Sequence, residues 1–366
     1  MKLTIKRETL LNPLQQVIGA VERRQTLPIL GNVLLSSNEK GLTLTATDLE
    51  IEMISRLDSP VGDFFQTTIP ARKLLDICKA LPESANIKFV VEDNRITLTS
   101  ARSRFSLSTL PATDFPSLDE INEQQQFVIS QGDLKSLFDK TSFAMAQQDV
   151  RYYLNGILME LSNNQIKLVA TDGHRLALSQ IKSDLELDEV KQIIIPRKAV
   201  LELGRLLDTV EESARVILSQ NHIRVELGNF VFTSKLIDGK FPDYKRVIPV
   251  DGNKTLEVDR TLLRNSMNRI AILSNEKYRG IRLTLNKDNL SIQANNPDQE
   301  EAEEELAVVY DEGDMEIGFN VTYIIDILGV LSSEKVQIKL KDANSSCIIS
   351  DSNDESSLYV VMPMRL

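Results

Sequence analysis

The side chains with the greatest capacity for chemistry lie in one short segment, Asp172–Arg175, which reads DGHR. In a hydrolytic site His174 would activate a nucleophile such as Ser179, but the spacing of the two residues gives that arrangement no support. His174 and His222 are the only histidines, too few for a typical histidine-based zinc site. The fifteen glycines form no GxG, and neither GxSxG nor HExxH occurs. The sequence therefore favours a structural or binding role for this segment and predicts no catalytic residue, no metal and no cofactor.

The DGHR segment starts at the end of a heptapeptide that occurs in three copies. They are LTLTATD at Leu42–Asp48, IKLVATD at Ile166–Asp172 and LSIQANN at Leu290–Asn296, each offset from the next by 124 residues. Repeats of this length indicate a duplicated domain rather than the short unit of a solenoid. Because Asp48 and Asn296 have no neighbouring histidine, we do not expect one reaction to be shared by the copies.

The same succession of elements is expected in each repeat. A short strand precedes a helix with an apolar stripe, as in Leu3–Ile5 followed by Leu10, Leu14 and Val17. Strands that alternate apolar and polar residues come next, and a second apolar helix follows them. Two helices on one face of antiparallel sheet make an α+β fold. The predicted domains are residues 1–122, 123–250 and 251–366.

The composition is that of a globular protein with an acidic balance. The chain has 366 residues, 42% of them hydrophobic, and a net charge of −11. This charge argues mildly against a generally basic nucleic-acid surface, but it leaves room for a locally basic face. Cys78 and Cys347 are isolated and are expected to be buried, reduced thiols. The N-terminal segment has no apolar signal region and no run of 18 apolar residues occurs, so we expect a cytoplasmic protein without a membrane span.

Basic residues gather on the predicted helices, whereas acidic residues gather elsewhere, notably in Asp298–Glu305 (DQEEAEEE). On a single helix, lysines and arginines usually form a solvated face. Here the pairs Arg72/Lys73 and Arg197/Lys198 occupy equivalent places in two repeats, which favours a shared positive surface.

The width of a helix limits what such a surface could enclose. Helices are about 10 Å wide, so six in a closed ring leave a hole of roughly 9 Å and twelve leave roughly 28 Å. A DNA duplex is about 16–20 Å across, judged from its groove depths. A head-to-tail dimer would therefore encircle DNA, whereas a monomer would not.

The chain resembles the bacterial DNA polymerase III β sliding clamps along its whole length. The matching segments are TLPILGN (26–32), SRFSLSTLPATDFP (103–116), QDVRYYLNG (148–156), ATDGHRLA (170–177), FTSKLIDGKFPDY (232–244), ILSNEKYRG (272–280), ANNPDQEEAEEE (294–305) and YVVMPMRL (359–366). Two small departures are Gln147 before Gln148 and a longer glutamate run around Glu305.

This resemblance implies three tandem clamp domains that form half of a ring, in a homodimer with helices inside and sheets outside. It also implies a processivity factor that is not an enzyme, is loaded onto primed DNA by an ATP-driven clamp loader, and slides on double-stranded DNA without sequence preference. The DNA-facing residues it implies are Arg24, Gln148, Tyr152, Tyr153, Arg197 and Lys198. For Tyr152 and Tyr153 the alternative of half-buried strand residues stays open.

The resemblance further implies an apolar groove between the second and third domains. Short linear motifs of the polymerase III catalytic subunit, the clamp loader, other polymerases and repair proteins would occupy it in turn. One set of matching residues is Leu154, Thr171, Gly173, His174, Arg175, Leu176, Pro242, Arg246, Val247, Val360 and Met362. An adjoining set is Arg151, Tyr153, Asn320, Tyr323, Met362, Pro363, Met364 and Arg365. A last strand merely docked in the core would explain Val360 better than Met364.

The implied dimer contact joins the first domain of one chain to the third domain of the other. Phe105 and Leu107 would meet Ile272 and Leu273, and the basic residues Lys73, Arg102 and Arg104 would face the acidic residues Glu300, Glu301, Glu303 and Glu304. Taken alone, the acidic run would be interpreted as a solvated loop.

Two other classes of function compete with the clamp. One is a DNA-modifying enzyme that uses Asp172 and His174, and the other is a protein-interaction scaffold that does not bind DNA.

Overall fold

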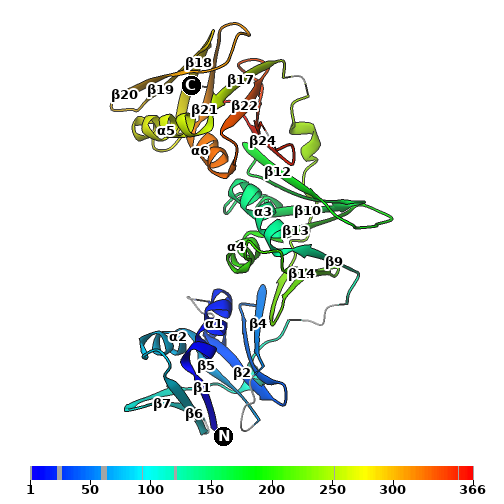
Figure 1. Ribbon diagram of the computed structural model, residues 1–366, viewed down its shortest axis with the longest axis vertical. Coiled ribbons are helices and arrows are strands. Elements are labelled where there is room, and N and C mark those ends of the chain that lie inside the picture. Colours follow the sequence, from blue (N-terminus) through cyan, green and yellow to red (C-terminus); the bar gives the residue numbers. More distant parts are fainter. Residues whose placement is uncertain are drawn as a thin grey trace. The chain divides into compact units, whose positions relative to one another are not determined.

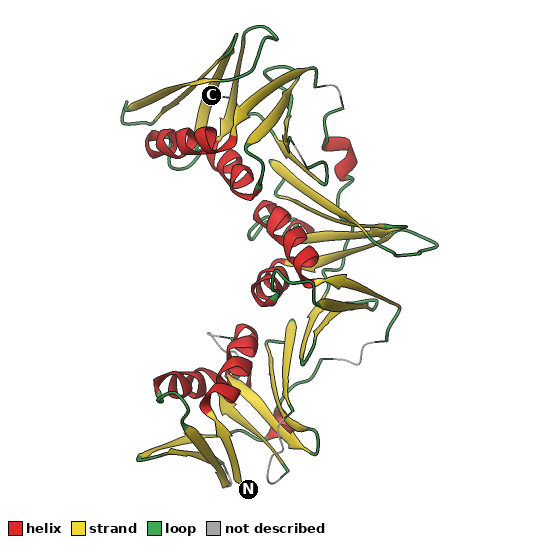
Figure 2. Ribbon diagram, in the orientation of Figure 1, coloured by secondary structure: helices red, strands yellow, loops and turns green. Residues whose placement is uncertain are grey.

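The computed structural model describes residues 2–22, 27–58, 64–92, 94–118, 122–250, 252–352 and 354–365. The chain divides into two compact units, and each is described by itself. Unit 1 comprises Met1–Gly132 and Arg205–Leu236, and unit 2 comprises Asp133–Gly204 and Ile237–Leu366. Figure 1 labels the elements of both units, and Figure 2 separates helices from strands by colour.

The predicted α+β fold is confirmed, with two α-helices contributed by each repeat. They are α1 (Arg7–Val17) and α2 (Ala71–Ala80), then α3 (Gln131–Thr141) and α4 (Arg197–Leu206), then α5 (Arg260–Ile270) and α6 (Val321–Val330). In α1 the stripe of Leu10, Leu14 and Val17 is fully buried, and α1 packs on strands β3 and β4. Burial of each such side chain stabilises the fold by about 1.5–3 kcal/mol.

Unit 1 contains two antiparallel sheets. The smaller has the order β1 (Lys2–Lys6), β6 (Asn86–Glu92), β7 (Arg95–Ser100) and β8 (Ser103–Ser108). The larger has the order β5 (Phe65–Pro70), β2 (Asn32–Asn38), β3 (Gly41–Thr47), β4 (Ile51–Leu57), β16 (Phe230–Lys235), β15 (His222–Leu227), β14 (Ser213–Leu218) and β9 (Gln125–Ser130).

Unit 2 has a matching pair of sheets. The larger has the order β13 (Lys191–Pro196), β10 (Gly156–Ser162), β11 (Gln165–Thr171), β12 (Arg175–Lys182), β24 (Ser357–Val361), β23 (Cys347–Asp351), β22 (Lys335–Leu340) and β17 (Lys254–Asp259). The smaller has the order β20 (Glu301–Ala307), β19 (Asn289–Asn295), β18 (Gly280–Asn286) and β21 (Met315–Asn320).

The repeated heptapeptide forms β3, β11 and β19 together with the first residue of the turn that follows each strand. In β3 the leucines at 42 and 44 are buried and Thr43 is only half-buried, as the alternation predicts. The residue that closes each copy then caps the turn with its side-chain oxygen. Asp48 Oδ1 accepts from the Ile51 N–H at 2.8 Å, and Asp172 Oδ1 accepts from the Arg175 N–H at 3.0 Å. Asn296 Oδ1 accepts from the Glu300 N–H at 3.0 Å. The three residues recur because each shapes a turn, which an aspartate or an asparagine can do equally well.

Neighbouring repeats are joined by the pairing of two strands, which we call a junction. Strand β4 pairs with β16 and places Met53 opposite Phe232. Strand β12 pairs with β24 and places Ala177 opposite Tyr359. In both junctions a strand that follows a repeated heptapeptide pairs with the last strand of the next repeat. All four residues are fully buried, so each junction belongs to the core.

Within the described residues, no helix combines the length and the apolar character that crossing a membrane requires.

An ion pair reinforces the second junction. Lys140 Nζ at the end of α3 lies 2.8 Å from Asp354 Oδ2 in the segment that leads to β24, and both side chains are less than one-third exposed. Burial raises the pKa of Asp354, but the hydrogen bonds from Lys140 and Ser356 and the charge of Lys140 outweigh it and lower the pKa to about 2.

We expect Asp354→Asn to destabilise unit 2 by about 1 kcal/mol at pH 6. The carboxylate has a lower pKa in the folded chain than in the unfolded chain, so its contribution is complete above about pH 4 and is lost as the pH falls towards 2. Thermal unfolding measured from pH 2 to pH 7 should show the two proteins converging at low pH. Lys140→Met should lower the stability by the same amount, and the double variant should be no less stable than either single variant. A difference in unfolding temperature between wild type and Asp354→Asn that does not depend on pH would contradict this account.

Candidate functional site

The predicted groove residues of unit 2 surround one hydrophobic cluster. It includes Leu154 from the 3₁₀ helix η5 (Tyr152–Leu154), Leu176 from β12 and Val360 from β24. Tyr153 packs against the cluster and is only partly buried. The three aliphatic side chains are each at most 2% exposed. They therefore form the base of an apolar site, and the more exposed residues around them form its walls.

The segment between β16 and β17 supplies one wall. Phe241 and Tyr244 point into the cluster and are nearly buried. Pro242, Arg246 and Val247, which the sequence analysis assigned to the groove, are exposed. Arg246 forms an exposed ion pair with Asp243 at 2.9 Å, within the same segment. Two buried aromatic anchors thus hold a short stretch of accessible side chains beside the cluster.

The Asp172–Arg175 turn forms a second wall. Gly173 has φ +89°, a conformation that favours glycine, and a Cβ placed there would lie 3.0 Å from the Arg151 guanidinium. Thr171 Oγ1 donates to the Arg175 carbonyl at 2.6 Å and accepts from the Gly173 N–H at 3.1 Å. His174 is exposed. The turn therefore presents the imidazole at the surface and keeps Arg151 against the backbone.

The guanidinium of Arg175 lies beneath this surface, although the sequence analysis assigned the residue to the groove lining. Its side chain is 10% exposed. It donates to Asp326 Oδ2 on α6 at 2.6 Å and to the carbonyl of Phe143 at 2.7 Å. The same guanidinium stacks 4.5 Å from the ring centroid of Tyr323. Arg175 therefore ties the turn to α6 and orients Tyr323.

The C-terminal segment borders both sets of predicted residues. The Met362 N–H donates to the His174 carbonyl at 2.9 Å, and the Met364 N–H donates to the Gly318 carbonyl at 2.8 Å. Val360 belongs to β24 and is buried, as a docked last strand requires, whereas Met362 and Met364 are half-buried. Met364 and Arg365 of this segment also line a polar pocket of about 490 Å³, together with Arg282 and Glu316. The flexible methionines can line a site for varied ligands.

Asn320 has a local role that the sequence analysis did not foresee. Its Oδ1 caps α6 by accepting from the Thr322 N–H at 2.9 Å. The sequence analysis also missed Asp326, Phe143, Glu160 and Tyr244. Each of them forms a hydrogen bond with a residue more than 30 positions away in the chain. No local pattern marks such contacts.

The DNA-facing candidates within unit 2 fall into two groups. Tyr152 is 57% exposed and lies in η5, so the alternative of a half-buried strand residue is wrong. Its ring forms an edge-on pair with Tyr153, with 5.8 Å between centroids. Gln148 is exposed with φ +55°. Arg24 lies outside the described residues.

The second group begins α4. Lys198 is exposed, whereas Arg197 is half-buried and donates to the Met145 carbonyl at 3.3 Å. Burial and the nearby charge of Arg175 lower the pKa of Arg197. Part of the donor capacity of Arg197 is thus already used within the protein.

The dimer candidates lie on edge strands and exposed helix ends. Strand β8 carries Arg104 exposed and Phe105 and Leu107 half-buried. Ile272, in the 3₁₀ helix η7 (Ala271–Leu273), is 76% exposed. Lys73 and Arg102 are exposed as well, and Leu273 is half-buried.

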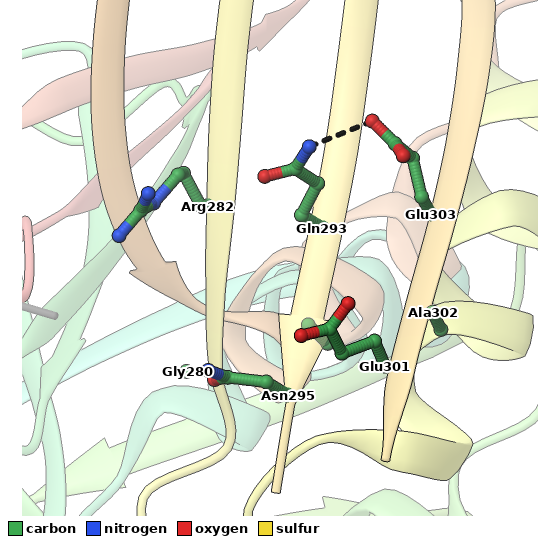
Figure 3. A pocket seen from close by; sticks show the side chains of 8 residues that line it. Gly280, Arg282, Gln293, Asn295, Glu301, Ala302 and Glu303 are labelled. Carbon is green, nitrogen blue, oxygen red and sulfur yellow. Dashed lines mark hydrogen bonds between the residues drawn. The ribbon is translucent and has the colours of Figure 1, made fainter. Parts of the chain in front are cut away.

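The acidic run forms β20 and divides between two faces. Glu304 points toward α5, where Arg269 and Ser266 donate to its carboxylate. Glu301 and Glu303 lie on the opposite face, in a pocket of about 350 Å³ that Arg282 and Gln293 also line. Figure 3 shows the Gln293 amide directed at Glu303, to which it donates at 2.6 Å. Glu304 is therefore neutralised within its own chain, whereas Glu301 and Glu303 face outward.

Comparison with known proteins accounts for the whole chain. Three family models match it, for the N-terminal, central and C-terminal domains of the DNA polymerase III beta subunit, at residues 1–119, 128–243 and 245–365. The beta sliding clamp of Pseudomonas putida is 53% identical, with 100% of both chains covered.

Solved structures agree with this assignment. The crystal structure of the DNA polymerase III subunit beta from Pseudomonas aeruginosa is 52% identical, with a TM-score of 0.97 and 100% of both chains covered. The Pseudomonas aeruginosa sliding clamp bound to griselimycin is 53% identical, with a TM-score of 0.96 and the same coverage. Matches of this extent leave one assignment: the chain belongs to the family of DNA polymerase III beta subunits, the beta sliding clamps.

Proposed function

We propose that the protein is a non-catalytic processivity factor that works as a homodimeric ring around duplex DNA in the cytoplasm. It would tether the polymerase III catalytic subunit, the clamp loader and other DNA-processing proteins through the groove of unit 2. Three tandem domains, at residues 1–122, 123–250 and 251–366, would form half of the ring. The observation that carries the dimer is the junction, which occurs twice within the chain. The first repeat and the third repeat each have an edge strand, β8 and β20, that could form a third junction with another copy.

The internal repeat supplies those strands and their register. Ala302 on β20 pairs with Ala294, as Met53 pairs with Ala46 and Ala177 with Ala170. Phe105 on β8 is the third residue after a two-residue hairpin loop, as Phe232 is on β16. Strands β20 and β8 are edges of their sheets. Ala302 of one protomer would therefore lie opposite Phe105 of its partner.

This register brings opposite charges together. With Ala302 opposite Phe105, Glu303 of one protomer lies opposite Arg104 of its partner in the antiparallel pair. Directly opposed residues point to the same face of a sheet, so the two charges would meet. Phe105 and Ala302 are half-buried in the single chain, although their equivalents in both internal junctions are fully buried. A partner strand would cover them.

A closed ring needs only weak contact with DNA. Diffuse attraction from basic groups, such as the exposed Lys198, would keep the duplex centred and would be screened by salt. No sequence-specific contact is needed for a link that is topological. The excess of negative charge in the chain would repel DNA elsewhere on the surface.

The dimer register can be tested by exchanging charges. Arg104→Glu or Glu303→Arg alone places like charges opposite each other and should weaken dimerisation by about tenfold. The combined variant should recover most of the affinity. Sedimentation equilibrium across a range of concentrations measures the change, with Glu39→Arg, in an exposed turn outside both edge strands, as the control. If the double variant is as weak as the sum of the single ones, the register is wrong.

DNA encirclement can be tested with Arg24→Glu/Lys198→Glu. We expect several-fold lower retention on nicked circular DNA at low salt, because the positive charge that centres the duplex is reversed. The difference from wild type should shrink as salt rises and screens those charges. Wild-type protein should slide off when the circle is linearised. Lys182→Glu, on an exposed strand end, serves as the control and should behave as wild type. Unchanged retention of the double variant would favour the scaffold that does not bind DNA.

The groove can be tested with His174→Ala. The substitution removes an exposed imidazole but keeps the carbonyl that accepts from Met362. A fluorescent peptide with the clamp-binding motif of the polymerase III catalytic subunit should bind about three- to tenfold more weakly in an anisotropy assay. Retention on circular DNA should not change. Chemical turnover of DNA by the wild type that disappears in the variant would instead favour the enzyme hypothesis.

A further inference from the structure

A buried carboxylate lies behind the groove and is not part of its lining. Glu160 on β10 is 6% exposed. Its Oε1 accepts from the Tyr244 hydroxyl at 3.0 Å, and its Oε2 accepts from Gln192 Nε2 at 2.7 Å. Lys167 Nζ, on the neighbouring strand β11, lies 3.6 Å from Oε1. Both carboxylate oxygens are therefore engaged, one of them by the segment that forms a wall of the groove.

The surroundings keep this contact charged on one side and neutral on the other. Burial raises the pKa of Glu160, but the hydrogen bonds from Gln192 and Tyr244 and the charge of Lys167 outweigh it and keep the pKa below its usual value. Burial and the charge of Glu160 raise the pKa of Tyr244. At neutral pH the tyrosine therefore donates to an ionised carboxylate, a stronger hydrogen bond than one between neutral groups.

The wall is also attached to the sheet near its start and by packing. The Ile237 N–H donates to the Ile194 carbonyl at 2.9 Å, and Ile237 and Ile248 pack against the cluster. Residues 236–253 lie between β16 and β17, outside both strands, and the 3₁₀ helix η6 (Tyr244–Val247) is the regular element of the part that the structure describes. The Arg246–Asp243 ion pair is internal to the segment and largely exposed. Phe241 packs in the cluster, and Tyr244 combines packing in it with a directional hydrogen bond. Within η6, Tyr244 is therefore the residue whose side chain both packs in the cluster and hydrogen-bonds to the sheet.

We propose that Glu160 is a positioning residue for the peptide groove, which it serves by fixing Tyr244 and hence the wall that carries Pro242, Arg246 and Val247. This inference rests on the proposed function of the groove. A wall held in place before the peptide arrives loses less conformational entropy on binding. Loss of the hydrogen bond would leave the ring of Tyr244 in the cluster but would let η6 shift along the sheet.

The experiment compares Tyr244→Phe, which removes only the hydroxyl, with Glu160→Gln, which keeps an acceptor, and Glu160→Leu, which does not. The matched control is Gln165→Ala, which removes a 3.0 Å side-chain hydrogen bond to Gln180 from the same sheet. The probe is the fluorescent motif peptide of the polymerase III catalytic subunit. Hydrogen exchange of the amides in residues 241–250 reports on the wall without any peptide.

We expect Tyr244→Phe and Glu160→Leu to weaken peptide binding five- to tenfold and to speed amide exchange in 241–250. Glu160→Gln should rescue both properties to within about twofold of wild type, and Gln165→Ala should leave both unchanged. Wild-type peptide affinity and wild-type exchange in Tyr244→Phe would overturn the proposal. So would equal losses in all variants and in the control, which would indicate general destabilisation. If the wild type does not bind the peptide, the groove function fails, and the exchange data still decide whether Glu160 fixes the wall.

Discussion

Pairing between the edge strands of successive repeats is the constraint on which the rest of the structure depends. Each repeat offers one edge strand to the repeat before it and one to the repeat after it, and unpaired edges leave backbone donors and acceptors without protein partners. The junctions β4–β16 and β12–β24 satisfy those groups and bury an aromatic residue in each case. The groove exists because Leu176 and Val360 come from the two sides of one junction and meet in one cluster.

Arg175 extends the same junction from the sheet to the helices. One guanidinium bonds to α6 and to the carbonyl of Phe143, and its plane stacks on Tyr323. Asp172 and Asp326 balance its charge, so a nearly buried cation is tolerated. The turn that carries His174 and the helix that carries Tyr323 are therefore held as one body. A ligand that spans both would meet a surface that is already assembled.

The periodic features were predictable from the sequence, because they depend on local spacing. The three copies of the heptapeptide, the amphipathic helices and the α+β class all follow from apolar residues at regular intervals. The role of Asp172 was predictable in part: its recurrence as Asp48 and Asn296 argued against a reaction, but only the backbone geometry shows that it caps a turn.

Contacts between distant residues were not predictable from local spacing. Glu160 and Tyr244 are 84 residues apart, and Arg175 and Asp326 are 151 apart. The family resemblance implied a groove-lining side chain at 175, yet the fold turns the guanidinium of Arg175 inward. Likewise, the run of glutamates gave no sign that Glu304 points toward α5 while Glu303 points away, because that division depends on which face of β20 the helix covers.

The alternation along β20 has a consequence for how copies recognise one another. Its outward residues, Glu301, Glu303 and Glu305, are all acidic, whereas β8 presents Arg104 on its exposed face. Two β20 edges would repel each other, and so would two β8 edges. In the proposed dimer, the charges that favour pairing of β20 with β8 would disfavour pairing of two β20 strands or of two β8 strands, so copies would associate in one direction only.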